Sequence, residues 1–105
     1  MITYNVTVKV EPEIAEEWLN WMKEEHMPEV VQTGLFTGYR LSRLLEQDEA
    51  EGITFSAQYF CRTLDDYKTY ISDYAASMRE KGFARFGSRF IAFRSVMQEE
   101  ACSNA

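Results

Sequence analysis

The sequence is poor in the residues that build metal and disulfide sites. It has one histidine, His26, and two cysteines, Cys61 and Cys102, which form no CxxC motif. Because a structural zinc site requires about four such ligands, we expect no metal site and two free thiols. The sequence also lacks a glycine-rich phosphate loop, a GxSxG motif and a specific carboxylate pair. No short catalytic motif therefore indicates a reaction, and no cofactor is expected.

Long apolar runs and an excess of positive charge are also missing. No stretch approaches the ~18 apolar residues of a membrane-spanning helix, and residues 1–13 lack the basic and apolar regions of a signal peptide. The net charge of −6 disfavours binding to nucleic acid or to an acidic membrane. We therefore expect a cytoplasmic protein that has neither nucleic acid nor membrane as a partner.

The composition is typical of a globular protein, and the sequence shows clear periodic patterns. Its 105 residues are 46% hydrophobic, which suits one domain with one core. Residues 2–10 alternate as a strand does, whereas residues 11–26 follow a helical period that places Trp18 and Trp21 on the inward arc.

A proline interrupts the helical pattern after the tryptophans. Pro28 disfavours helical geometry at the residue before it. We therefore expect the first helix to break near His26 and to restart as a short helix that Gly34 ends.

Strand and helix patterns alternate again in the second half of the chain. Thr63, with Asp66 three residues later, resembles a capping box that opens a helix, and Gly82 is its expected end. The remaining patterns are two strands at 35–46 and 53–62, a polar turn at 47–52 between them, and a last strand at 88–98.

The order strand, helix, strand, strand, helix, strand predicts an α+β fold. Right-handed crossovers and a central hairpin give a ferredoxin-like βαββαβ sandwich, in which two helices cover one face of a four-stranded antiparallel sheet. We expect one domain over residues 1–98 and a disordered tail over residues 99–105.

The second face of the predicted sheet has a mixed composition. Leu44, Phe60, Phe90 and Val96 form an apolar patch there, and such a patch on a small domain is commonly an interface. We expect a homodimer through this uncovered face. The same assignment places Asn5, Arg40 and Arg94 on the second face, and Tyr39, Leu41, Ile91 and Phe93 on the helix side.

The runs "YNVTVKV", "EEWLNWMKEEHMPEVVQTGLFTGYRL" and "FIAFR" resemble a small bacterial family classed as a domain of unknown function. The resemblance covers residues 1 to about 97. That family is similar in plan to the dimeric α/β barrel superfamily, which pairs its sheets back to back and includes haem-degrading enzymes and cofactor-free enzymes such as antibiotic-biosynthesis monooxygenases. The resemblance implies a homodimer. Haem-degrading members carry their ligand histidine on the second helix, where this chain has Tyr67, Tyr70 and Tyr74 instead.

Two catalytic candidates, His26 and Asn5, have alternative interpretations. His26 lies on the inward arc, so it either packs at a helix end beside Glu25 or transfers protons at a cavity. By the same resemblance, monooxygenase-like members use asparagine, tryptophan and histidine or tyrosine around an aromatic substrate. Asn5 matches that asparagine, or else it bonds across the dimer interface.

Four further residues are candidates for ligand binding. Trp18, Trp21 and Tyr67 would form the aromatic wall of a gap between helix and sheet, and Arg40 would bind an anion. The leading hypothesis is a homodimer that binds a small aromatic or anionic molecule. A cofactor-independent monooxygenase-like enzyme and a structural or protein-interaction module are the alternatives.

Overall fold

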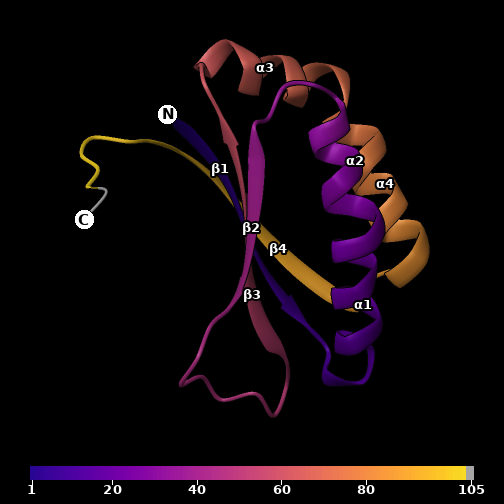
Figure 1. Cartoon of the computed structure of the whole chain (residues 1–105). Coiled ribbons are helices and arrows are strands. Elements are labelled where there is room, and N and C mark those ends of the chain that lie inside the picture. The colour runs from indigo at the N-terminus through magenta and orange to yellow at the C-terminus, as the bar shows by residue number, and fades with distance from the viewer. Residues whose placement is uncertain (104–105) are drawn as a thin grey trace.

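The computed structural model describes residues 1–103 and contains one four-stranded antiparallel sheet. Its strands are β1 (Ile2–Val10), β2 (Gly38–Arg43), β3 (Ile53–Cys61) and β4 (Phe90–Gln98), in the order β2-β3-β1-β4. All helices lie on one face of this sheet (Figure 1). The ferredoxin-like fold expected from the sequence is confirmed.

Two helical stretches connect the strands. The first contains η1 (Pro12–Ile14), α1 (Ala15–Trp21), η2 (Met22–His26) and α2 (Met27–Gln32). The second contains α3 (Leu64–Asp73) and α4 (Ala75–Phe86). Residues 99–103 follow β4 without regular secondary structure, and the last two residues of the expected tail lie outside the described residues.

The first helical stretch is continuous, so the expected break near His26 is wrong. Met27 keeps a right-handed helical backbone, and its N–H donates to the carbonyl of Met22, five residues earlier. This bond defines a π-helical turn. In a regular α-helix the ring of Pro28 would collide with the carbonyl of Glu24. The wider turn relieves that collision, and the helix continues until Gly34, whose φ of 84° ends it as expected.

The second helical stretch begins as predicted and ends later than predicted. The Thr63 side chain accepts a hydrogen bond of 3.1 Å from the backbone N–H of Asp66. The helix bends at Tyr74, where φ is −126°, and it continues through Gly82. Gly87, with φ of 60°, ends α4, so the prediction that Gly82 is the stop signal is wrong.

The strand register confirms the predicted faces of three strands and corrects the fourth. Val6 pairs with Arg94 and Val8 with Ala92, so Arg94 and Ala92 share the helix-covered face with the valines. Ile91 and Phe93, expected on that face, are instead 60% and 69% exposed on the uncovered face. Phe90 and Val96, which were expected on the uncovered face, lie instead on the helix-covered face. Both faces of "FIAF" are apolar, so hydrophobic alternation does not fix the register of this edge strand.

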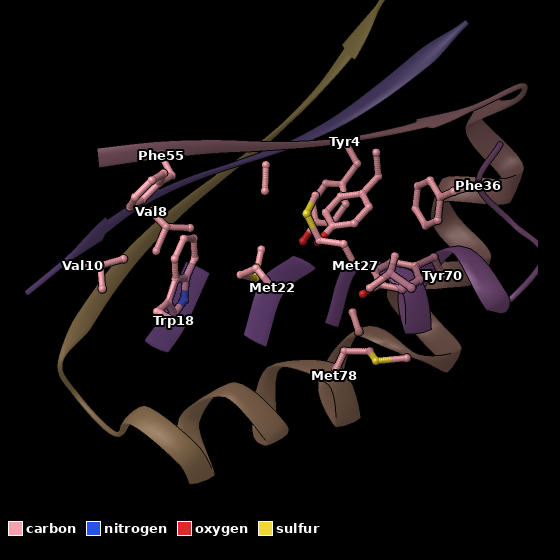
Figure 2. Packing of buried hydrophobic residues seen from close by; sticks show 14 of the residues in the cluster. Tyr4, Val8, Val10, Trp18, Met22, Met27, Phe36, Phe55, Tyr70 and Met78 are labelled. Carbon is pink, nitrogen blue, oxygen red and sulfur yellow. The ribbon is translucent and has the colours of Figure 1, made fainter. Parts of the chain in front are cut away.

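The core lies between the sheet and the helices and is rich in aromatic rings (Figure 2). At one end Trp18 packs against Phe55, with ring centroids 5.0 Å apart. At the other end the ring of Tyr4 lies 5.9 Å from Tyr59 and 5.9 Å from Tyr70. Tyr70 is therefore a core residue. The helix-facing side chains of β4 remain partly or largely exposed, so the core is thinnest at that edge.

The acidic first helical stretch and the basic α4 segment pair within one chain. Lys81 bonds Glu29 at 2.8 Å and Arg85 bonds Glu25 at 2.9 Å. These pairs are solvent-exposed, and such pairs contribute only about 0 to 1 kcal/mol each. Their main consequence is that carboxylates already compensate the charges of Lys81 and Arg85.

Candidate functional site

A cavity of about 70 Å³ lies between the helices and the β1–β4 half of the sheet. Fifteen residues line it. The sheet contributes Tyr4, Val6, Val8, Tyr59, Phe90, Ala92 and Arg94, and the helices contribute Trp18, Trp21, Met22, His26, Tyr70, Met78, Arg79 and Gly82.

Small residues on facing elements leave this space unfilled. Gly82 on α4 has no side chain, and a Cβ built there would lie 3.4 Å from Cη2 of Trp21 and 3.8 Å from the ring of Phe90. Ala92 on β4 is the other small lining residue. The cavity therefore arises where α4 and the edge strand face each other with little side-chain volume.

Burial distinguishes the floor of the cavity from its mouth. Tyr4, Trp18 and Tyr59 are at most 3% exposed, so they form the floor. Among the lining residues only Arg79 and Arg94 are exposed. These two arginines consequently mark the opening to solvent.

His26 lines the cavity at the end of the π-helical turn. Its ring stacks on Trp21, with centroids 4.7 Å apart and planes 22° apart. Its Nδ1 atom is buried and has no hydrogen-bond partner among the described residues. An unpaired buried polar atom costs about 1–3 kcal/mol, so the hydrogen-bonding capacity of this nitrogen is unused within the described residues.

The surroundings keep the His26 imidazole neutral. Its pKa is lowered from 6.5 to about 4, mainly by burial; the negative charge of Glu29 opposes this shift, and the positive charges of Lys81 and Arg94, each weaker in effect than Glu29, add to it. A neutral imidazole has one donor and one acceptor nitrogen. His26 is therefore uncharged near neutral pH when a ligand binds.

Arg79 and Arg94 are the charged residues of the cavity, and no carboxylate lines it. The Nη2 atom of Arg79 donates a hydrogen bond of 3.4 Å to the hydroxyl of Tyr4. Within residues 1–103, neither arginine forms an ion pair. The cavity is therefore positively charged at its mouth.

Tyr59 and Tyr70 on the cavity wall keep their protons. Burial raises the pKa of Tyr59 and of Tyr70 above its ordinary value of 10. A protonated phenol both donates and accepts hydrogen bonds. The wall accordingly supplies neutral polar groups and aromatic faces rather than negative charge.

The structure brings three of the sequence-predicted candidates together and separates the others. Trp18, Trp21 and His26 line the cavity, and Tyr67 packs against the ring of Tyr4, 5.4 Å between centroids, without lining it. The remaining two lie on the uncovered face of the sheet.

Asn5 and Arg40 occupy that uncovered face. The Oδ1 atom of Asn5 accepts a bond of 2.7 Å from Ser56, and its Nδ2 donates to Thr7. The guanidinium of Arg40 lies 5.7 Å from the ring centroid of Phe60. Asn5 and His26 therefore belong to opposite faces of the sheet and do not form one site.

Sequence reasoning did not place Arg79, Gly82 or Ala92 at the site. The available signal was the helical spacing of Met78, Gly82 and Phe86, all of which are buried, with Arg79 beside them. The sequence pattern predicts Arg94 on the uncovered face, and this prediction is wrong. Its position depended on the register of β4, which the sequence left ambiguous.

The described part of the chain contains no cluster of three residues able to hold a metal ion. No helix in residues 1–103 is both long and apolar enough to cross a membrane.

Two solved structures are similar in fold to this chain. A dimeric ferredoxin-like protein from an uncultured marine organism superposes with a TM-score of 0.74 at 11% identity, over 97% of each chain. An ethyl tert-butyl ether D (EthD) family protein from Bacillus halodurans has a TM-score of 0.63 at 11% identity, over 94% of this chain and 99% of the other. At such identity these likenesses show the fold alone.

Comparison with curated proteins gives no match. A family model does match, over residues 1–100, which is nearly the whole sequence. The chain therefore belongs to the family described as domain of unknown function DUF4286.

Proposed function

We propose that this protein is a cytoplasmic homodimer that binds a small aromatic or anionic molecule in the cavity beside His26. The observation that carries the proposal is a cavity walled by aromatic rings and lined by His26, a residue whose buried Nδ1 has no partner among residues 1–103. Ligand sites are typically apolar clefts with a few placed polar groups. The free thiols of Cys61 and Cys102 suit a reducing compartment.

The two tryptophans provide a direct test of binding. Their indole N–H signals, assigned by Trp18→Phe and Trp21→Phe, should shift when a planar fragment enters the cavity. Ala92→Leu should fill the cavity and abolish those shifts. Ala84→Leu, at an exposed position of α4, is the control and should leave them unchanged. Shifts that persist in Ala92→Leu place the fragment elsewhere and would exclude the cavity as the site.

The homodimer part of the proposal rests on the uncovered face of the sheet. Ile91, Phe93 and Met97 are 60%, 69% and 43% exposed there, on alternate positions of β4. Exposed apolar rows of this kind commonly form interfaces. A similar solved structure is described as dimeric, which supports the same assembly.

Light scattering after size exclusion tests the assembly. We expect a mass of about twice 12.3 kDa, and we expect Phe93→Glu to give a monomer. Phe83→Glu is the matched control, because Phe83 is 64% exposed on α4 and away from the sheet face. A monomeric wild-type protein at micromolar concentration would reject the dimer.

A cofactor-independent monooxygenase-like activity is the second candidate, favoured by the neutral imidazole of His26 in an aromatic cavity. Because Asn5 lies on the other face, His26 would act without it. Oxygen uptake with phenolic substrates should then fall at least about tenfold in His26→Ala. Equal turnover in wild type and variant would remove His26 from any such reaction. If neither ligand nor substrate binds while the dimer forms, the structural or interaction module is the remaining function.

A further inference from the structure

The cations at the cavity mouth differ from the other cations of residues 75–98. Lys81, Arg85 and Arg89 each lie within 3.5 Å of a glutamate. In the described chain, the guanidinium of Arg79 has the Tyr4 hydroxyl as its hydrogen-bond partner, and that of Arg94 has no hydrogen-bond or ion-pair partner. Among the cations of residues 75–98, the two without a carboxylate partner are the arginines that line the cavity.

Charge is confined to one end of this cavity. Apart from the two arginines, its lining consists of apolar side chains, tyrosines and a neutral histidine. Arg79 and Arg94 both oppose the rise that burial causes in the pKa of Tyr70, and Arg94 adds to the lowering that burial causes in the pKa of His26, so both guanidiniums act electrostatically on the same wall. A ligand that fits must be apolar at its inner end and negative at its outer end.

We infer that the cavity takes a small monoanion with an apolar, ring-sized body, whose carboxylate is held at the mouth by Arg79 and Arg94. This inference rests on the proposed function and specifies its ligand class. The planar guanidinium matches a carboxylate with two parallel hydrogen bonds. The Tyr4 hydroxyl holds Arg79, so one of the two donors is already positioned before the ligand arrives.

The apolar end of the ligand lies against Trp21 and His26. The stacked rings of Trp21 and His26 offer a flat aromatic surface, and an aromatic body packs well against such a surface. Because His26 is neutral, the ligand's inner end contacts it through a hydrogen bond or a ring face and needs no second charge. A cationic ligand is rejected, since it would face two unpaired arginines.

Three probes of nearly equal shape distinguish the effect of ligand charge from the effect of ligand shape. Benzoate, benzamide and benzamidine carry charges of about −1, 0 and +1 near pH 7 on the same ring. We expect benzoate to bind at least about tenfold more tightly than benzamide, because hydrogen bonds to charged groups are roughly twice as strong as neutral ones. Benzamidine should not bind. The readout is titration by NMR, following the indole signals of Trp18 and Trp21.

Substitutions then test whether the two arginines cause the preference for benzoate over benzamide. Arg94→Gln and Arg79→Gln should each reduce the ratio of benzoate to benzamide affinity to near one, with benzamide affinity unchanged. Arg62→Gln, at an exposed arginine outside the cavity, should leave the ratio as in wild type. Thermal melts confirm folding of each variant, and Arg94→Gln serves alone if loss of the Tyr4 contact unfolds Arg79→Gln.

The imidazole of His26 supplies an independent readout. A bound carboxylate should raise the His26 pKa above about 4, because a nearby negative charge favours the imidazolium, and benzamide should not. If benzoate and benzamide bind equally, the inference fails while binding in the cavity stands. If none of the three probes moves the indole signals, the proposed function fails and the inference fails with it.

Discussion

Trp21 and His26 stack with their ring centroids 4.7 Å apart, although they are five residues apart on one helical stretch. In a regular α-helix, residues five apart point about 140° away from each other. The π-helical turn from Met22 to His26 brings them into line, because its hydrogen bonds join residues five apart. The backbone adjustment at Pro28 thus produces the imidazole orientation that the cavity requires.

The depressed pKa of His26 predicts a pH dependence of folding. Above pH 6.5 the imidazole is neutral in both folded and unfolded chains and contributes nothing. As the pH falls from 6.5 towards 4, His26 becomes protonated in the unfolded chain but stays neutral in the folded one. The free energy of unfolding therefore decreases. The loss reaches about 3 kcal/mol at pH 4. Urea denaturation at pH 7, 6, 5 and 4 measures it.

His26→Gln isolates this contribution from the carboxylates, which also titrate in that range. The free energy difference between wild type and variant should change by about 1.4 kcal/mol per pH unit between pH 6 and 4.5. NMR of the ring protons gives the His26 pKa directly. A titration midpoint near 6.5 would show that the ring is solvated and that the cavity does not bury it.

Removal of the Thr63 cap should destabilise the second helical stretch. Thr63→Ala deletes the oxygen that accepts the Asp66 N–H at 3.1 Å, and loss of such a cap costs about 1 kcal/mol. Thr69→Ala, at an exposed position inside α3, makes the same chemical change without a cap. It should be neutral or slightly stabilising in the same denaturation experiment. Equal effects in both variants would contradict a capping role.

The parts of the fold that were predictable depend on local chemistry. The alternation of residues 2–10, the Thr63 cap and the Gly34 stop each act within a few residues, and the structure contains all three. Where the outcome depends on distant packing, the predictions were wrong. Gly82 lies inside the helix, opposite Trp21 from another element, and Gly87 adopts the left-handed φ that ends α4.

The difference between local chemistry and distant packing also explains which parts of the site were predictable. The helical period placed Trp18, Trp21 and His26 on an inward arc, and all three line the cavity. The cations at the mouth required the register of β4, which the two apolar faces of "FIAF" leave open. No single-sequence pattern indicates a π-helical turn, because Pro28 is equally consistent with a broken helix.

The two cysteines should react with thiol reagents at very different rates. Cys61 is fully buried, its thiol lies 3.4 Å from the Thr63 carbonyl, and burial raises its pKa. Since the thiolate is the reactive form, Cys61 should react only on unfolding, whereas the exposed Cys102 reacts at once. Absorbance with an aromatic disulfide reagent at pH 8 should show one thiol per native chain. In Cys102→Ser the fast phase should vanish, and a remaining fast phase would mean that Cys61 is accessible.

Gly82 and Gly87, five residues apart, should respond to alanine with opposite signs. Gly82 has ordinary helical φ and space for a Cβ at 3.4 Å from Trp21, so Gly82→Ala should stabilise the protein by about 0.5–1 kcal/mol through helix propensity. Gly87 has φ of 60°, where an alanine Cβ is strained, so Gly87→Ala should destabilise by about 1–2 kcal/mol. The added methyl at 82 also intrudes on the cavity and should weaken fragment binding, which Gly87→Ala leaves intact. Stabilisation with unchanged binding would show that the ligand does not reach the Gly82 wall.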